Sequence, residues 1–262
     1  MEGTLAVWLL EPETGQLEPA LLERGHRIVR GNDPPPRPRP EALLVNAAWL
    51  GEGLADRVRE CMERFPAMAP VLAGVTRRQI ELQTLSVGRY RMLAGALEPA
   101  GAVRAVEAAV EAVRREAGPI ARPDTKTIHV ELPSVVDLVQ PLALYLTREC
   151  RTMGWPEEPL STAIPLCLTE ALVNAVVHGN RESPARRVQA EVRLTPGQFW
   201  SNITDEGQGF DPVRVPPPTL PENLLREHGR GLFLMRHYMS EVSFNAKGNS
   251  VTLIRRIGPA GV

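Results

Sequence analysis

The sequence predicts two units, an open parallel α/β sheet followed by an α+β sandwich. Three observations predict this order. Short apolar runs alternate with helical spacing through about the first 116 residues, and two helical segments then precede strands of period two. Between them, residues 114–124 lose periodicity and collect charge, glycine and proline. At 262 residues the chain can bury two cores, and we expect domains over 1–116 and 128–262 joined by a linker at 117–127.

In the first unit, five apolar runs predict strands and four amphipathic stretches predict helices. Strands are expected at 5–10, 26–29, 42–45, 71–75 and 92–96. Helices are expected at 14–24, 52–64, 77–85 and 102–115. The proline-rich run 34–40 replaces the helix expected between the second and third strands. The alternation predicts an open parallel sheet of the flavodoxin-like kind.

The residues at the ends of these strands give the first unit a resemblance to the receiver domain of response regulators. In that family an acidic cluster follows the first strand, a phosphorylated Asp ends the third, Ser or Thr ends the fourth, and Lys-Pro follows the fifth. Glu11, Asn46, Thr76 and Glu98-Pro99 stand at the matching places. Asn46 has no nucleophilic carboxylate and Glu98 reverses the charge, so we expect no phosphoryl chemistry here. The unit is then a pseudo-receiver that senses or docks something, or alternatively a scaffold or dimerisation module without a ligand.

In the second unit, strands are expected at 128–132, 188–194, 199–204, 242–245 and 250–256, and a helix at 135–151. Ser134 is the expected N-cap of that helix. A second helix is expected to open near Ser161 or Thr162, with Pro165 in its first turn, and to end at Gly179-Asn180. Lys247-Gly248-Asn249 predicts a hairpin between the last two strands. This order predicts an α+β sandwich with one face of the sheet covered.

The second helix carries three polar side chains, Glu170, Asn174 and His178, each four residues apart in an apolar run. On a helix they share one stripe. Apolar residues take up most of the remaining circumference, so the helix is expected to be largely buried, where a carboxylate and a carboxamide need partners. Two glycine-rich stretches follow, Asp205-Glu206-Gly207-Gln208-Gly209 and Gly229-Arg230-Gly231-Leu232. Glycines allow close backbone approach and free N–H groups bind phosphate, so the set predicts a nucleotide site.

Two common phosphate motifs are absent from the sequence: it has no P-loop, and Gly207-Gln208-Gly209 lacks the third glycine of the dinucleotide fingerprint. The blocks Glu170-x-x-x-Asn174-Ala175-x-x-His178-Gly179, Asp205-x-Gly207-x-Gly209-Phe210 and Gly229-Arg230-Gly231-Leu232 instead resemble the N, G1 and G2 boxes of the GHKL ATPases, whose fold is the Bergerat-type α/β sandwich. Within that superfamily they are most similar to the anti-sigma factor serine kinases of the RsbW and SpoIIAB type. The resemblance covers about residues 128–257.

The resemblance implies ATP and Mg²⁺ as ligands and gives roles to the boxes. Asp205 would accept a hydrogen bond from the adenine amino group, and Gly207 and Gly209 would let the backbone pass close beneath base and ribose. Asn174 would bind Mg²⁺ through its carboxamide oxygen. Glu170 would be the general base that orients or deprotonates the attacking hydroxyl.

The resemblance leaves alternatives open for several residues, among them those expected near the phosphates. The helix start Gly229-Arg230-Gly231-Leu232 would supply N–H groups to the phosphates, with Arg230 either a counter-charge for the γ-phosphate or a solvated arginine. His178 either contacts phosphate or caps the helix. The family's threonine before the last strand is replaced, with Thr252 or Ser250 as substitutes for its support of the adenine carboxylate. The lid at 212–221 is rich in proline and is expected to be stiffer than glycine-rich lids.

The composition of the chain favours protein or small-molecule partners. With 30 basic and 31 acidic residues the net charge is -1, which offers no general attraction to nucleic acid or to an anionic membrane. The three cysteines are far apart, which favours reduced thiols. The amino terminus has no basic region followed by a long apolar stretch, and no run of about 18 uncharged apolar residues occurs, so we expect a cytoplasmic protein.

The sequence therefore predicts a protein serine/threonine kinase of the anti-sigma type, which would phosphorylate a small antagonist protein and, when free, sequester a sigma factor. None of the five histidines lies on a dimerising helix ahead of the site, as a histidine kinase would require. The alternatives are a non-catalytic ATP-gated signalling adaptor docked through its pseudo-receiver, and a scaffold that binds no nucleotide. A homodimer is left open.

Overall fold

The computed structural model describes residues 4–11, 15–29, 39–50, 53–65, 67–82, 85, 87–115, 124–211 and 230–257. The chain is a mixed α/β protein that divides into two compact units, Met1–Pro123 and Asp124–Val262. Each unit contains strands, helices and a set of buried apolar residues of its own.

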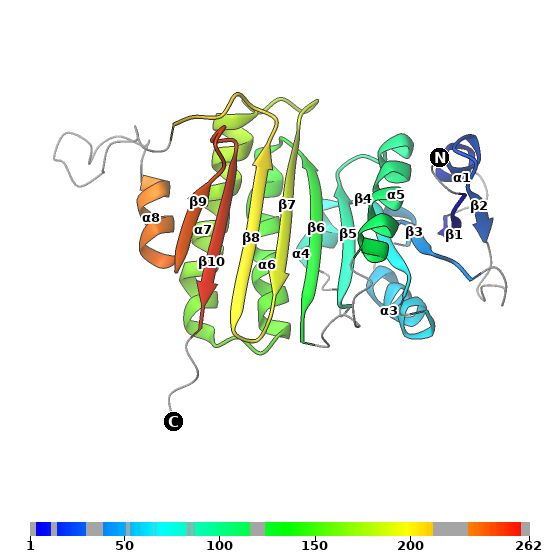
Figure 1. Ribbon diagram of the computed structural model, residues 1–262, viewed down its shortest axis with the longest axis horizontal. Coiled ribbons are helices and arrows are strands. Elements are labelled where there is room, and N and C mark those ends of the chain that lie inside the picture. The colour runs from blue at the N-terminus through cyan, green and yellow to red at the C-terminus, as the bar shows by residue number, and fades with distance from the viewer. Residues whose placement is uncertain are drawn as a thin grey trace. The chain divides into compact units, whose positions relative to one another are not determined.

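The described part of the first unit forms a parallel sheet with helices between its strands (Figure 1). The strands are β1 (Ala6–Leu10), β2 (Arg27–Val29), β3 (Ala42–Asn46), β4 (Ala69–Val75) and β5 (Arg89–Ala94). Their order is β2-β1-β3-β4-β5, and every neighbouring pair is parallel. The helices are α1 (Leu17–Glu23), α2 (Ala47–Leu50), α3 (Leu54–Arg64), α4 (Arg77–Leu82) and α5 (Pro99–Arg115). The five predicted strands and four predicted helices are confirmed, and the short helix α2 is additional.

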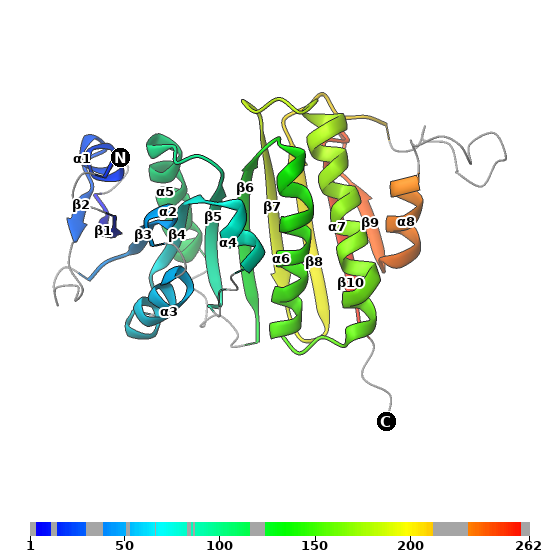
Figure 2. The same cartoon turned by 180° about the vertical axis from the view of Figure 1, so that it is seen from behind.

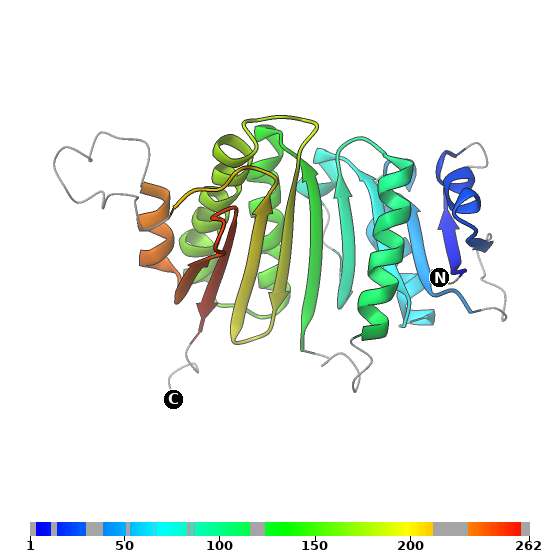
Figure 3. The same cartoon turned by 45° about the horizontal axis from the view of Figure 1, so that its top comes forward.

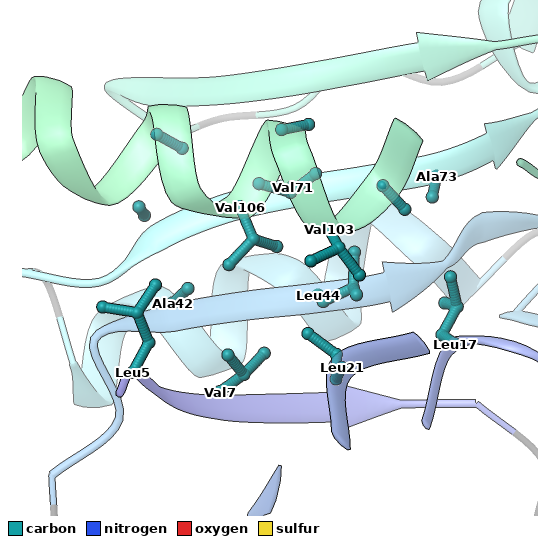
Figure 4. Packing of buried hydrophobic residues seen from close by; sticks show 14 of the residues in the cluster. Leu5, Val7, Leu17, Leu21, Ala42, Leu44, Val71, Ala73, Val103 and Val106 are labelled. Carbon is teal, nitrogen blue, oxygen red and sulfur yellow. The ribbon is translucent and has the colours of Figure 1, made fainter. Parts of the chain in front are cut away.

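The core of the first unit follows the alternation of its strands. Leu5 and Val7 of the first strand region point to the face that α1 and α5 cover, where they pack with Val103 and Val106 (Figures 3 and 4). Trp8, one position on, points to the other face and lies edge-on to Phe65 with ring centroids 6.1 Å apart. Both faces of the sheet are therefore buried, as expected of a parallel sheet.

The second unit is an antiparallel sheet with its helices on one face (Figures 1 and 2). Its strands are β6 (Lys126–Pro133), β7 (Arg187–Leu194), β8 (Gln198–Asp205), β9 (Glu241–Phe244) and β10 (Ser250–Arg256), in the order β6-β7-β8-β10-β9. A 3₁₀ turn (Val136–Leu138) leads into α6 (Val139–Thr152), and α7 (Ile164–Val173) and α8 (Arg230–Tyr238) follow. The predicted α+β arrangement with one covered face is confirmed.

The helical segment around α7 begins earlier than expected and ends at Gly179-Asn180, as expected. A π-helical segment, Pro159–Ala163, precedes it and a second one, Asn174–Gly179, continues it. The expected opening near Ser161 or Thr162 is wrong, since helical backbone already covers Pro159, whereas Pro165 lies in the first turn of α7 as expected. Pro165 has no N–H to donate, and it lies where the hydrogen-bond spacing changes from π to α.

The segment Pro159–Gly179 is, by length and composition, apolar enough to cross a membrane, with a mean hydropathy of 1.6. It packs against α6, α8 and β8 within the second unit. Because a buried core helix needs the same composition, this packing accounts for its apolar residues.

The expected N-cap Ser134 is also wrong, since no side chain caps the turn that opens at Val136. The Ser134 hydroxyl instead donates to the Arg186 carbonyl at 3.1 Å and accepts from the Asn180 side chain at 2.8 Å. The hairpin at 247–249 is confirmed: Gly248 adopts a φ of 75°, and its N–H donates to the Asn245 carbonyl at 3.0 Å.

Several predictions lie outside the described residues. These are the proline-rich run at 34–38, most of the linker at 117–123, the lid at 212–221, and Gly229. Strand β6 begins at Lys126, so the last two residues assigned to the linker belong to that strand.

Candidate functional site

The described residues of the second unit enclose a cavity of about 690 Å³. It lies between the C-terminal half of the α7 helix, the turn after β8, the β9–β10 hairpin and the start of α8. Seven of the predicted site residues line it: Glu170, Asn174, His178, Asp205, Gly209, Gly231 and Leu232. The volume falls within the range of small-molecule and cofactor sites.

Glu170 lies on α7 and is partly buried. Burial raises the pKa of its carboxyl group, which suits a base that must hold a proton transiently. The first turn of α8 packs directly on this carboxylate, because a β-carbon at Gly231 would overlap Glu170 Oε2. The Cys167 thiol, one turn earlier on α7, donates to the Leu234 carbonyl at 3.8 Å and so also links α7 to α8.

Asp205 ends β8 and turns its carboxylate toward the end of the α7 helix. The Gly207 N–H donates to Asp205 Oδ1 at 2.7 Å. A β-carbon at Gly179 or at Gly207 would overlap this carboxylate, so both positions require glycine. Burial raises the pKa of Asp205, against the Gly207 N–H and the charges of Lys247 and Arg186, which lower it.

The backbone of Asp205 is held from the β10 side by Asn249. The Asp205 N–H donates to the Asn249 carbonyl at 2.9 Å, and Asn249 Nδ2 donates to the Asp205 carbonyl at 2.6 Å. The residue that stands near the family's threonine thus supports the backbone of Asp205, while Gly207 supports its carboxylate.

Part of the cavity wall is apolar. Phe210 and Phe244 form an edge-to-face pair with ring centroids 5.4 Å apart, and Ile203, Leu232 and Val251 also line the cavity. Such a wall with a few fixed polar groups suits a flat heterocycle with one polar edge.

Some predicted residues lie away from this cavity. Thr252 pairs with Asn202 across the β8–β10 ladder, and its hydroxyl accepts from Asn202 Nδ2 at 3.0 Å. Because side chains alternate along a strand, Thr252 points to the face opposite Val251 and does not reach Asp205. Ser250 lines the cavity, but its hydroxyl bonds to Asn202 and Thr204.

Arg230 is exposed at the start of α8 and does not line the cavity, whereas His178 lines it from the last turn of the helix, where it is exposed. Gly229 lies outside the described residues. The cavity also takes in two arginines that the sequence did not suggest, Arg181 and Arg186. Arg181 stands at a φ of 55° in the loop after the helix, and no spacing rule marks such a position.

The donor set fits a nucleotide with a magnesium ion. Gly179, Gly207 and Gly231 let the backbone lie directly against the Asp205 and Glu170 carboxylates, where a β-carbon would overlap them. Asn174 lies one turn beyond Glu170 on the wall of the same cavity. Among the described residues no group of three His, Cys, Asp or Glu side chains could hold a metal ion. A magnesium ion at Asn174 would therefore take its other ligands from phosphates and water, the usual arrangement for this ion.

Comparison with known proteins adds an independent result. Residues 132–255 match the histidine kinase-like ATPase domain. The serine/threonine-protein kinase BtrW of Bordetella bronchiseptica is 31% identical over 104 residues, which are 38% of this chain and 73% of that protein. The anti-sigma F factor of Bacillus subtilis is 32% identical over 97 residues, 36% of this chain and 66% of that protein. The serine-protein kinase RsbW of Oceanobacillus iheyensis is 26% identical over 124 residues, 45% of this chain and 78% of that protein.

Proposed function

Because this chain belongs to the histidine kinase-like ATPase family, as an ATP-dependent protein serine kinase of the anti-sigma-factor type, we propose that its cavity positions ATP between Asp205 and Glu170 for transfer to a partner's serine. The observation that carries this proposal is the placement of the two carboxylates in one cavity. Each carboxylate is in close contact with a glycine, at a position where a β-carbon would overlap it. Phosphoryl transfer from ATP needs one group that holds the adenine and another that acts on the attacking hydroxyl at the γ-phosphate.

Asp205 accepts the hydrogen bond of the adenine amino group. Its carboxylate is fixed by the Gly207 N–H and by the end of the α7 helix. The phenyl rings of Phe210 and Phe244 form the apolar side of the same compartment. Gly207 and Gly209 allow the backbone to approach the base and ribose.

Glu170 acts at the other end of the cavity. The serine hydroxyl of the partner gives its proton to the Glu170 carboxylate while its oxygen forms the bond to the γ-phosphorus. The bond from that phosphorus to the β,γ-bridging oxygen breaks, and ADP leaves. The N–H groups at the start of α8, near Gly231 and Leu232, face the phosphates in this arrangement.

Asn174 would hold Mg²⁺ through its side-chain oxygen, and the ion when bound would neutralise charge on the phosphates. Arg181 and Arg186 add positive charge to the wall of the cavity. Arg230 and His178 remain secondary candidates for phosphate contact, since the first is exposed and the second lies at the exposed end of the helix. Thr252 is not retained, because its hydroxyl bonds to Asn202.

The partners in this proposal are proteins: an antagonist that carries the serine and a sigma factor that the unoccupied kinase sequesters. The support is the naming of relatives as anti-sigma F factor and as serine-protein kinase RsbW. A cytoplasmic location accords with three cysteines that are free and buried.

The first unit is proposed to be a flavodoxin-like pseudo-receiver over residues 1–116, with the kinase domain over 128–262. Its strand order, with β1 between β2 and β3, is that of flavodoxin-like sheets. Its strand-end residues are engaged as caps: Glu11 accepts from the N–H groups of Leu17 and Glu18 at 3.2 and 2.8 Å, and Asn46 Oδ1 accepts from the Trp49 N–H at 3.4 Å. Because Glu11 and Asn46 already accept bonds from the backbone of this unit, we favour a role of the unit in docking over one in phosphoryl chemistry.

The test is transfer from Mg-ATP to candidate antagonist proteins. Glu170→Ala should slow transfer by about 10² to 10⁴, the usual contribution of a general base. Glu158→Gln is the matched control, because Glu158 is an exposed carboxylate just before the same helix. Equal transfer from wild type and Glu170→Ala would overturn the kinase mechanism. ATP binding with no transfer to any antagonist would favour the ATP-gated adaptor.

A further inference from the structure

Asn180, the residue that follows the α7 helix, has a fully buried side chain whose three hydrogen bonds fix its orientation. Its Nδ2 donates to Ser134 Oγ at 2.8 Å and to the Arg187 carbonyl at 2.9 Å, and its Oδ1 accepts from the Glu206 N–H at 2.9 Å. The Arg187 carbonyl can only accept and the Glu206 N–H can only donate. The amide therefore fits in one orientation.

These bonds join three strands to the end of the nucleotide-binding helix. Ser134 follows β6, Arg187 begins β7, and Glu206 follows Asp205 at the end of β8. The Glu206 N–H belongs to the peptide group that Asp205 contributes, so Asn180 fixes that peptide plane directly. Its neighbour Gly179 packs on the Asp205 carboxylate itself.

We propose that Asn180 is a positioning residue for adenine recognition, acting through the Asp205–Glu206 peptide to set the direction of the Asp205 carboxylate. This inference rests on the proposed role of Asp205. Asn180 does not line the cavity and makes no contact with the nucleotide in this arrangement. Asn249, in the hairpin just before β10, donates to the carbonyl of the same peptide group, so that peptide is held from both sides.

The side chain at this position must both donate and accept. An alanine would leave the Glu206 N–H and the Arg187 carbonyl buried without this partner. An aspartate would keep an acceptor for the Glu206 N–H but would set an oxygen against the Arg187 carbonyl. Alanine should therefore disturb both stability and adenine recognition, whereas aspartate should lower stability and largely keep recognition.

The experiment compares the Kd of ATP with that of purine riboside triphosphate, which lacks the 6-amino group, by calorimetry on the full chain. Wild type should prefer ATP by about tenfold, the size of one hydrogen bond to a charged group. Asp205→Asn should remove most of this preference. Asn180→Ala should reduce it at least threefold, and Asn180→Asp should restore it toward the wild-type value. Asn202→Ala is the matched control, because Asn202 lies in β8, does not line the cavity, and donates to the hydroxyls of Ser250 and Thr252.

An Asn180→Ala variant that is less stable yet keeps the full preference, beside an Asp205→Asn variant that loses it, would overturn the positioning role alone. An Asp205→Asn variant that keeps the preference would overturn the adenine role of Asp205 and this inference with it. If Asn180→Ala does not fold, Asn180→Ser replaces it, since a serine keeps a donor but is too short to reach the Glu206 N–H.

Discussion

The α-carbon of Gly231 lies against the carboxylate of Glu170, so close that a β-carbon at Gly231 would overlap Glu170 Oε2. The first turn of α8 and the proposed base therefore share one boundary of the cavity. Any side chain at Gly231 must move either the base or the helix that faces the phosphates.

Gly231→Ala should lower the kcat of phosphotransfer by about 10- to 100-fold, because a displacement near 1 Å of a catalytic group can cost that much. The measurement is steady-state transfer to the antagonist protein. Gly197→Ala is the matched control, since a β-carbon at Gly197 meets nothing within 4 Å. A Gly231→Ala enzyme with wild-type kcat would contradict the placement of Glu170 at the reacting end.

Glu170→Gln should slow transfer and also stabilise the fold at neutral pH. Burial raises the pKa of Glu170 above its unfolded value, so the contribution of this group to stability is full below the unfolded pKa and is lost as pH rises through the folded pKa. Glutamine cannot ionise and avoids this loss, and we expect a gain of about 0.5–1 kcal/mol at pH 8. Thermal melts at pH 8 and at pH 4 measure it, and a gain of equal size at both values would contradict the cause.

The rate of transfer should depend on pH through the same group. The base works as the carboxylate, so kcat should fall as pH drops through the raised pKa of Glu170. The fall in kcat should begin at a higher pH than it would with a glutamate of ordinary pKa. The residual kcat of Glu170→Gln should not show this fall. A kcat profile that is unchanged by this substitution would assign the titration to another group.

ATP affinity should titrate separately through Asp205. Burial raises the pKa of this carboxyl group, so protonation as pH falls replaces the charged acceptor for the adenine amino group by a weaker neutral one. Gly179→Ala should weaken ATP binding about tenfold or more at any pH, because its β-carbon would displace the same carboxylate. Calorimetric titration of ATP at several pH values measures both effects. Gly197→Ala should bind as wild type does.

The spacing of residues along the chain was sufficient to predict many of the helices, strands and site residues. Glu170 and Asn174 stand four residues apart, and any helix brings such residues to one side. The period of two likewise predicted the strands that carry Asp205 and Ser250. The same period shows why Thr252 is outside the cavity: Val251 points into it, so the next residue points away.

Contacts between distant residues were not predictable from spacing. Asn180 and Ser134 are 46 positions apart and Asn249 and Asp205 are 44 apart, and neither pair follows from a helical or strand period. Ser134 precedes a helical pattern and so resembles an N-cap, but its hydroxyl bonds instead to Arg186, just before β7, and to Asn180, just after the α7 helix. Lys126 was assigned to the linker at 117–127, although the structure buries it at the start of β6.

In the first unit, Glu11→Ala should lower stability without changing transfer. The Glu11 carboxylate accepts from two N–H groups at the start of α1, and loss of such a cap costs about 1 kcal/mol. Thermal melting measures the loss. Glu23→Ala is the control, because Glu23 is exposed at the other end of α1. A large loss of transfer with unchanged stability would instead give Glu11 a signalling role.

The buried ion pair between Lys126 of β6 and Glu149 of α6 gives the sharpest test of the core of the second unit. The side chain of Glu149 is fully buried and that of Lys126 is 6% exposed, and Thr152 Oγ1 lies 3.3 Å from the ammonium. Removing one partner leaves a buried charge, so Glu149→Gln should cost about 3–5 kcal/mol of unfolding free energy. The double variant Lys126→Met/Glu149→Leu removes both charges and should recover most of that loss. Urea unfolding measures each variant, with Glu191→Gln at the exposed pair with Arg193 as a control expected to lose less than about 1 kcal/mol. A double variant as unstable as Glu149→Gln would mean that the shape of the two side chains, and not their charge, holds β6 to α6.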